Sequence, residues 1–270
     1  MSNNLAIIGF GNIAKAIITP LLENKFLKPE NIFCLVKTNK SLDNIKSSYP
    51  YKINAFLADS SESKLVWDCP FKLLSVKPQQ IDDLVEYQVD KKVNNTIISI
   101  LAGVSLKRLE NKFPNHNCVR AVTNIPILIG KGLTGITWGL NMDDEKKIFI
   151  KNIFRTSSKI YEMSEEYLDI FLALTSSSPA IIALIIDSLS DGGLSGGLNK
   201  KLSEELVIEM ILGTVSLLKE SNLTISDLRN MVTSPGGTTI SALNMLEKNS
   251  FRSTLIDAIL AARNRSKEFR

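Results

Sequence analysis

The sequence contains few of the residues that most often carry acid–base and metal chemistry. Its 270 residues include one histidine, His116, and three widely separated cysteines. The cysteines lack metal-type spacing, so we expect three small core residues in a reducing cytoplasm and no metal site. His116 falls in a polar stretch just before an expected strand, which predicts a surface loop residue. We therefore expect chemistry that uses no histidine base.

Long apolar runs and clustered positive charge are also absent from the sequence. The longest apolar candidate, residues 179–186, is bounded by Ser178 and Asp187 and falls short of the ~18 residues of a membrane span. The first apolar run continues into a glycine turn, unlike a signal peptide. The net charge of +4 is concentrated only in the last expected helix, without a basic stripe interleaved with aromatics. These absences predict a cytoplasmic protein with neither nucleic-acid nor membrane partners.

A strand, a glycine turn and a helix follow one another at the N-terminus. Residues 5–8 form an apolar run, and Gly9, Gly11 and Ala14 follow in the spacing G-x-G-x-x-A before helical periodicity begins. In this context the pattern binds a dinucleotide pyrophosphate, because glycine permits the tight turn and the close approach of phosphates. We predict cofactor contacts at Gly9, Gly11, Asn12 and Ile13. A tight turn without a ligand is the alternative.

The end of the second expected strand indicates which nicotinamide cofactor is preferred. NAD-binding folds place an acidic residue there to hold the ribose 2′-hydroxyl. Here the chain continues with Lys37, Thr38 and Lys40, which suit a 2′-phosphate and give a diol no carboxylate partner. NADPH is therefore favoured, and NADH stays open. The lysines alone are equally well explained as a solvated loop.

The first part of the chain alternates between strand-like and helical patterns. Such alternation predicts an α/β fold with a Rossmann-type, doubly wound and mostly parallel sheet, which we assign to residues 1–161. Ligands bind beyond the carboxyl ends of such strands, and these ends are polar or glycine-rich here. The expected strands are residues 5–8, 32–36, 71–76, 96–100, 119–122 and 134–138.

Strand patterns disappear after Met163, and we assign residues 162–270 to an all-α domain. The helix expected over residues 165–191 is apolar nearly all round, and a domain of this size offers little interior to bury it. Burial against a second copy of the chain predicts an obligate dimer. Residues 191–197 are glycine-rich and predict a flexible turn between helices. Further helices are expected at residues 200–221, 226–231, 238–248 and 252–270.

A second glycine turn opens the helix that starts near Thr238. Pro235, Gly236 and Gly237 interrupt the chain, and apolar residues resume at helical spacing after Thr239. The backbone N–H groups at such a start lack intrahelical acceptors and lie at the positive end of the helix dipole. They suit a small carboxylate, with threonine hydroxyls beside it. A simple capping turn is the alternative.

Taken together, these motifs resemble the pyrroline-5-carboxylate reductase family, and the resemblance covers nearly the whole chain. It is strongest in the closing turn Val-Thr-Ser-Pro-Gly-Gly-Thr-Thr, residues 232–239, which matches without a change. The segments that carry it are residues 8–17, 76–79, 99–104, 120–126, 172–180, 232–239 and 258–269.

The resemblance implies reduction of the cyclic imine 1-pyrroline-5-carboxylate to L-proline, in proline biosynthesis, with hydride from NADPH. By analogy, Thr239 would be the catalytic residue through a hydrogen bond to the ring nitrogen. The other implied contacts are with substrate at Ser177, Ser234, Gly237, Thr238 and Asn124, and with cofactor at Lys37, Thr38, Lys77, Pro78, Ala102 and Gly103. The implied partner is a second copy of the chain, in a homodimer or higher homo-oligomer.

Three positions depart from the family pattern and keep alternatives open. Ile125 replaces a threonine, and Ser176 and Ser178 replace two glycines in a Ser-Gly-Ser-Gly-Pro-Ala segment. The added side chains leave open a reductase of another cyclic imine, or a catalytically impaired paralogue that binds NADP. A hydroxy-acid dehydrogenase is less favoured, because the helix after Met163 offers no acid in a matching motif.

Overall fold

The computed structural model describes residues 3–86, 95–140 and 142–268. Its internal contacts divide the chain into two compact units. Unit 1 comprises Met1–Ser176 together with Ala262–Arg270, and unit 2 comprises Ser177–Ala261.

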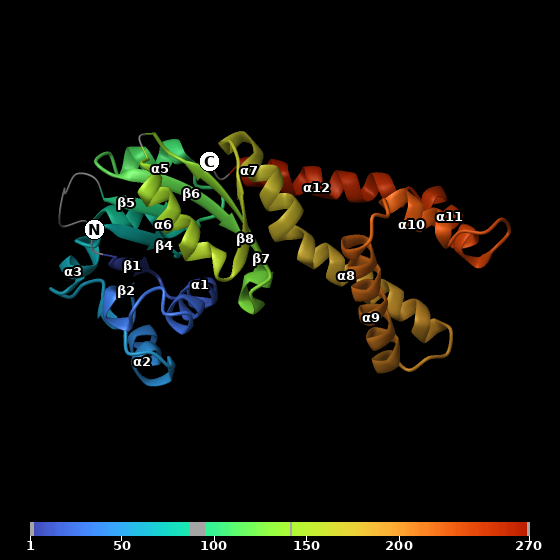
Figure 1. Cartoon of the computed structure of the whole chain (residues 1–270), viewed down its shortest axis with the longest axis horizontal. Coiled ribbons are helices and arrows are strands. Elements are labelled where there is room, and N and C mark those ends of the chain that lie inside the picture. Colours follow the sequence, from blue (N-terminus) through green and yellow to red (C-terminus); the bar gives the residue numbers. More distant parts are fainter. Residues whose placement is uncertain (1–2, 87–94, 141, 269–270) are drawn as a thin grey trace. The chain divides into compact units, whose positions relative to one another are not determined.

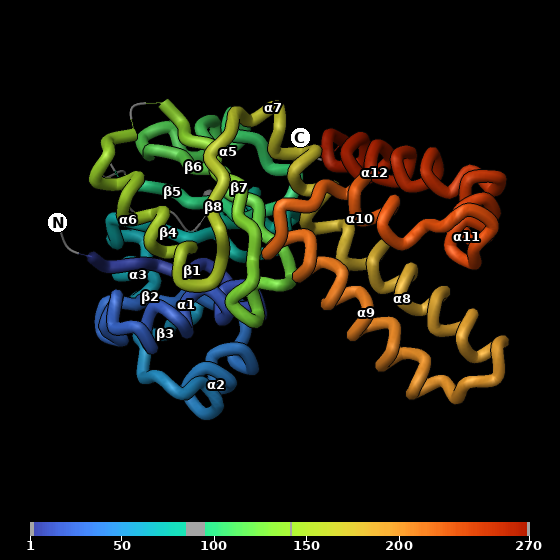
Figure 2. The backbone as a smooth tube through the Cα atoms, turned by 45° about the vertical axis from the view of Figure 1, so that its right-hand side comes forward, coloured from blue at the N-terminus to red at the C-terminus, as the bar shows by residue number. Residues whose placement is uncertain are grey.

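Unit 1 is built on an eight-stranded sheet, shown in Figure 1, and its edge strand β3 is labelled in Figure 2. The strand order is β3-β2-β1-β4-β5-β6-β7-β8, and all neighbours are parallel except β6 and β7. This confirms the predicted doubly wound, mostly parallel sheet. The strands are β1 Leu5–Ile8, β2 Ile32–Val36, β3 Asn54–Leu57, β4 Phe71–Leu74, β5 Thr96–Ser99, β6 Asn117–Thr123, β7 Gly132–Trp138 and β8 Ser158–Glu162.

Helices cover both faces of this sheet, as the continuous apolar strands require. On β1, Leu5 and Ile7 pack into the hydrophobic cluster that includes α1, α2 and α6, whereas Ala6 and Ile8 pack into the cluster that includes α3, α4 and α5. Every residue of β1 is therefore buried. The helices are α1 Asn12–Glu23, α2 Asn39–Ser48, α3 Ser63–Trp67, α4 Ile81–Glu86, α5 Leu106–Lys112 and α6 Asp144–Arg155.

Two strands, β3 and β8, are absent from the sequence-based expectation. They are the two edges of the sheet. An edge strand has one neighbour and is covered less completely, so its sequence is short and mixed in polarity. Only one residue in each of these strands is buried. Neither strand therefore produces the apolar run by which the other strands were recognised.

A buried ion-pair network joins the sheet to α7 (Glu165–Leu172) and to the end of the chain. The Arg120 guanidinium on β6 donates to Glu165 at 2.9 Å and to Asp169 at 3.1 Å. The Ser266 hydroxyl donates to the same Asp169 carboxylate at 3.1 Å, across 97 positions of sequence. Arg120 and Asp169 are completely buried, so each charge is stabilised by the opposite charge of the other. This network explains why the last residues belong to unit 1.

Unit 2 is helical, and Figure 2 shows α8 and α9 running side by side as a hairpin. Helix α8, Ser178–Ser195, continues through Gly192 and Gly193, so the predicted turn over 191–197 begins too early. Gly193 is needed for packing, because a Cβ there would overlap the Ser203 hydroxyl of α9. The remaining helices are α9 Lys200–Glu220, α10 Ile225–Met231, α11 Thr238–Lys248 and α12 Phe251–Lys267.

The expected single helix over 165–191 is interrupted by a π-helical segment at Ala173–Ser177. By length and composition, the stretch Glu165–Ser195 could cross a membrane, with a mean hydropathy of 1.9, contrary to our expectation that no segment would reach that length. Only 11% of its most apolar window is buried. Such a surface on a single chain calls for another apolar surface to cover it.

Candidate functional site

The glycine turn after β1 leaves the start of α1 open to a ligand. Gly9 has φ +89°, and a Cβ there would lie 2.7 Å from the Ser75 carbonyl oxygen, so only glycine fits. Gly11, the N-cap of α1, has no atom within 4 Å of the position of a Cβ. No side chain caps this helix, and its first turn has no acidic residue. The amides at Asn12 and Ile13 therefore suit a pyrophosphate.

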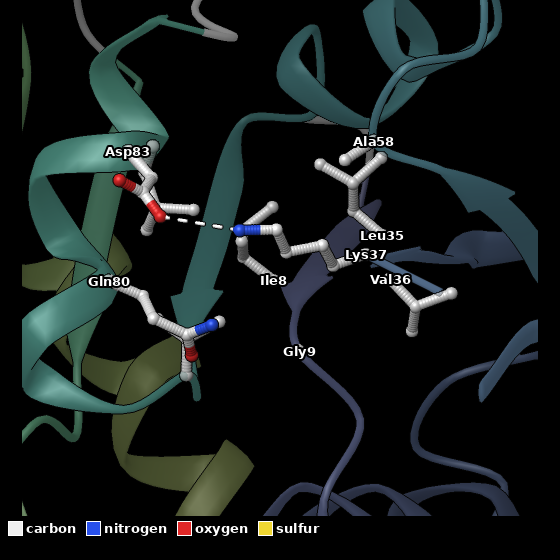
Figure 3. A pocket seen from close by; sticks show the side chains of 10 residues that line it. Ile8, Gly9, Leu35, Val36, Lys37, Ala58, Gln80 and Asp83 are labelled. Carbon is white, nitrogen blue, oxygen red and sulfur yellow. Dashed lines mark ion pairs between the residues drawn. The ribbon is translucent and has the colours of Figure 1, made fainter. Parts of the chain in front are cut away.

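Two cavities of unit 1 adjoin this turn and share Val76. The smaller one, about 60 Å³, lies at the ends of β1 and β2 and is shown in Figure 3. Its lining is Ile8, Gly9, Leu35, Val36, Lys37, Ala58, Val76, Gln80, Asp83 and Leu84. The larger one, about 510 Å³, lies at the start of α1 and is lined by Gly11, Asn12, Ile13, Ser75, Val76, Ile100, Thr123, Asn124, Ile125, Leu128 and Ser176.

These cavities sit where the strand order reverses, between β1 and β4. A dinucleotide binds across that point in doubly wound sheets, with its pyrophosphate on the glycine turn. The residues present therefore fit such a cofactor, with one half in each cavity.

The rim of the smaller cavity carries an ion pair. The Lys37 ammonium after β2 lies 3.5 Å from the Asp83 carboxylate of α4, and the two side chains point toward each other in Figure 3. Both are more than half exposed. Thr38 caps α2, since its hydroxyl oxygen accepts from the Ser41 amide at 3.2 Å. Of the two residues predicted here, Lys37 is thus the one that lines the cavity.

The other predicted cofactor residues lie on turns after neighbouring parallel strands. Lys77 and Pro78 follow β4, and Ala102 and Gly103 follow β5, with Gly103 at φ +75°. The lining of the larger cavity comes from the residues just before them, Ser75, Val76 and Ile100. Sequence reasoning missed these because they are ordinary strand-end residues with no motif of their own.

Asn124, predicted as a substrate contact, is bound to backbone at both ends of its amide. Its Nδ2 donates to the Thr175 carbonyl at 3.2 Å, and its Oδ1 accepts from the Leu133 amide at 2.8 Å. The neighbouring Ser176 hydroxyl donates to the Thr123 carbonyl at 2.9 Å. Ser176 therefore lines the larger cavity without closing it.

In unit 2, a second open helix start brings Ser234, Gly237, Thr238 and Thr239 into one turn. Gly236 has φ +71°, and the Gly237 amide donates to the Ser234 carbonyl at 3.1 Å. Gly237 is the N-cap of α11, which has neither a side-chain cap nor an acidic first turn. Ser177, the remaining predicted residue, directly precedes α8.

Among the helix starts described, α3, α7 and α8 also lack a side-chain cap, but only α1 and α11 have glycine as N-cap. Five helices have side-chain caps, which satisfy an amide that would otherwise face solvent or a ligand. These caps are Thr38 for α2, Ser105 for α5, Asp143 for α6, Asn199 for α9 and Thr224 for α10. A glycine N-cap without a side-chain partner therefore marks the two predicted binding turns.

The histidine and the three cysteines do not line either of the two cavities described above. His116 is half-buried rather than a surface residue, and burial together with the charge of Lys72 lowers its pKa to about 4. All three cysteines are free and buried, as expected, and burial raises the pKa of Cys69 and Cys118 to about 12. The described residues contain no group of three metal-ligating side chains.

Known proteins match this chain from end to end. A family model described as "Pyrroline-5-carboxylate reductase dimerisation" matches residues 165–269. A pyrroline-5-carboxylate reductase from Synechocystis is 35% identical over 99% of this chain and 98% of its own length. The chain belongs to the pyrroline-5-carboxylate reductase family.

Further comparisons agree with this family and with the fold. A pyrroline-5-carboxylate reductase from Glycine max is 31% identical over 99% of this chain and 96% of its own length. A Plasmodium falciparum pyrroline carboxylate reductase structure, with NADP bound, is 29% identical, covers 100% of this chain and 99% of that one, and has a TM-score of 0.85. A model described as "NADP oxidoreductase coenzyme F420-dependent" matches residues 4–103, which contain the first glycine turn.

Proposed function

We infer that the protein is a pyrroline-5-carboxylate reductase, which reduces the carbon–nitrogen double bond of 1-pyrroline-5-carboxylate to give L-proline. Membership in this family over the whole chain, with both glycine turns intact, is the observation that carries this function. The reduction adds a hydride to the imine carbon and a proton to the nitrogen. An imine nitrogen is readily protonated, so the site needs chiefly to position two rings and hold a carboxylate.

NADPH is the cofactor, and it supplies the hydride when bound. Gly9, Gly11, Asn12 and Ile13 would hold its pyrophosphate on the open start of α1. The smaller cavity would take the adenosine, beside Lys37, and the larger would take the nicotinamide. Lys77, Pro78, Ala102 and Gly103 would border that half from the turns after β4 and β5. No acidic residue follows β2 directly, which favours the 2′-phosphate of NADPH over NADH.

The turn before α11 would bind the substrate. The Gly237 amide, predicted as a carboxylate donor, donates instead to the Ser234 carbonyl at 3.1 Å. The Thr238 amide would hold the carboxylate beside Gly237 at the positive end of the helix, and the Thr239 hydroxyl would donate to or accept from the ring nitrogen. Ser234 and Ser177 would complete the polar surface around the ring. In this proposal Thr239 is the catalytic residue.

A second copy of the chain is the proposed partner, in a homodimer or higher homo-oligomer. The family model that covers residues 165–269 describes dimerisation, and the helices of unit 2 expose many apolar side chains in the single chain. Burial of these apolar side chains against a second copy would be the main driving force for association of two chains. We also propose a cytoplasmic location, since all three cysteines are free thiols.

The serines at positions 176 and 178 were the sequence-based objection to an active enzyme, and Ser176 is the one that lines the larger cavity. Its hydroxyl is bound to the Thr123 carbonyl, and a cavity of about 510 Å³ remains beside it. This favours the active reductase over the impaired paralogue.

The function is tested by following NADPH absorbance with 1-pyrroline-5-carboxylate and with the six-membered piperideine analogue. We expect oxidation of NADPH with the five-membered ring and formation of proline in equal amount. Turnover of the six-membered ring alone would transfer the assignment to another cyclic imine. No turnover of either, with a melting temperature raised by NADPH but not further by proline, would support the impaired paralogue.

A further inference from the structure

The π-helical segment Ala173–Ser177 forms part of the wall of the larger cavity. A π turn carries one residue more than an α turn, so a backbone carbonyl is displaced from the regular ladder and needs another donor. Here the Thr175 carbonyl accepts from Asn124, and the Ser176 side chain reaches the Thr123 carbonyl. The wide turn is therefore held from the end of β6.

Asn124 ties three parts of unit 1 together. It directly follows β6, its Oδ1 accepts from the Leu133 amide on β7, and its Nδ2 donates to the π turn. The side chain is only 6% exposed. A buried amide satisfied by backbone on both sides fixes the distance between the groups it joins. Loss of the amide would leave a buried N–H and a carbonyl without these partners.

We propose that Asn124 is a positioning residue rather than a substrate ligand. It fixes the π turn, and with it Ser176, at the wall of the larger cavity, which would take the nicotinamide. Ser176 makes a second hydrogen bond that holds the π turn, because its hydroxyl donates to the Thr123 carbonyl at the end of β6. This assignment rests on the proposed function, and it deepens that function at the same site.

The test replaces Asn124 in the full-length protein. Asn124→Ala removes both bonds, and Asn124→Asp keeps an acceptor for Leu133 but loses the donor to Thr175. We expect kcat with saturating substrates to fall about tenfold or more in both variants, because small displacements at a reacting centre are costly. The KM for NADPH should change less than about twofold, since the pyrophosphate turn is untouched.

A matched control uses Asn54, whose Nδ2 also donates to backbone, at Glu30 and Ile32. It lies at the amino end of β3, outside both cavities of unit 1. Asn54→Ala should lower the melting temperature and leave kcat unchanged. If Asn124→Ala fails to fold, Ser176→Ala serves instead. It removes the hydrogen bond from Ser176 to the Thr123 carbonyl and should also lower kcat.

Three results would overturn the assignment. Asn124→Ala with a lowered melting temperature and unchanged kcat would make the residue purely structural. A higher KM for pyrroline-5-carboxylate in Asn124→Asp, with kcat unchanged, would restore the direct substrate contact. No turnover by the unmodified protein would remove the proposed function and this assignment together, whereas the first two outcomes leave the function intact.

Discussion

At the scale of single residues, Lys37 and Asp83 form an ion pair at the rim of the smaller cavity, where the ribose of the cofactor would bind. An exposed ion pair of this kind contributes little to stability, about 0–1 kcal/mol. Lys37 can therefore exchange Asp83 for a phosphate at small cost. The sequence alone indicated Lys37. Its ion-pair partner Asp83, on α4 and 46 positions further along the chain, would compete with a phosphate for the lysine.

We expect Lys37→Met to lower kcat/KM for NADPH about tenfold, the effect of one lost charge-assisted contact, and to leave NADH nearly unchanged. Asp83→Asn should shift the preference toward NADPH, because it frees the lysine. Initial rates with each cofactor measure both effects, with Lys46→Met on the exposed face of α2 as control. A loss of NADH use in Asp83→Asn would instead make this carboxylate a ribose ligand.

His116 makes the free energy of unfolding depend on pH. Burial and the charge of Lys72 lower its pKa from 6.5 to about 4. Between these values the unfolded chain binds a proton that the folded chain does not, so the free energy of unfolding falls as the pH falls from about 6.5 to about 4. Urea unfolding across this range should give a shallower pH dependence for His116→Asn than for the unmodified protein. Equal slopes would show that the histidine does not contribute.

At the scale of elements, α10 and α11 begin in different ways. Gly237 leaves the first amides of α11 open, and a Cβ there would lie 2.5 Å from the Ser234 hydroxyl oxygen. Thr224, by contrast, closes the start of α10 with a reciprocal capping box. The two helix starts lie in the same unit and differ in whether a ligand can reach the backbone.

We expect Gly237→Ala to raise the KM for pyrroline-5-carboxylate about tenfold, because the added carbon displaces Ser234 and crowds the amides that would hold the carboxylate. The affinity for NADPH should be unchanged. The control, Thr224→Ala, should lower stability by about 1 kcal/mol through loss of the cap and leave both KM values unaltered. Steady-state kinetics and urea unfolding of the pair give the comparison. Weaker NADPH binding in Gly237→Ala would place this turn at the cofactor.

At the scale of the whole molecule, unit 2 exposes apolar surface that a single chain does not bury. Helix α8 buries only Ser190, and α9 buries only Ser203, although both are rich in apolar residues. A single chain therefore does not bury the apolar side chains of α8 and α9. A second copy of the same surface would bury them, in line with the dimerisation family match.

We expect Leu212→Asp on α9 to shift the protein toward monomers, because it places a charge on an apolar surface that association would bury. Leu212 is 54% exposed in the single chain. Leu65→Asp on α3 is the matched control, since Leu65 is 50% exposed but belongs to unit 1. Sedimentation at several concentrations measures the assembly. Identical profiles for both variants would exclude α9 from the interface.

Most of the fold was predictable because its signals are local. The strand–glycine–helix order at the N-terminus, the buried central strands and the helix limits of α9 and α11 follow from periodicity and turn chemistry. The edge strands β3 and β8 were missed, because their mixed polarity resembles that of loops. The helical course of residues 192–193 was missed because two adjacent glycines indicate a turn, whereas Gly193 packs against Ser203 of another helix.

By itself, the sequence determined the two glycine turns and the apolar character of the C-terminal half. Each of these depends on residues that are neighbours in the chain. Only the tertiary structure decided that Asn124 holds a π turn, that His116 is half-buried and that Ser266 returns to Asp169 beside Arg120. These contacts join distant segments, and no local pattern records them, because burial and hydrogen bonding across the fold depend on where the chain meets itself.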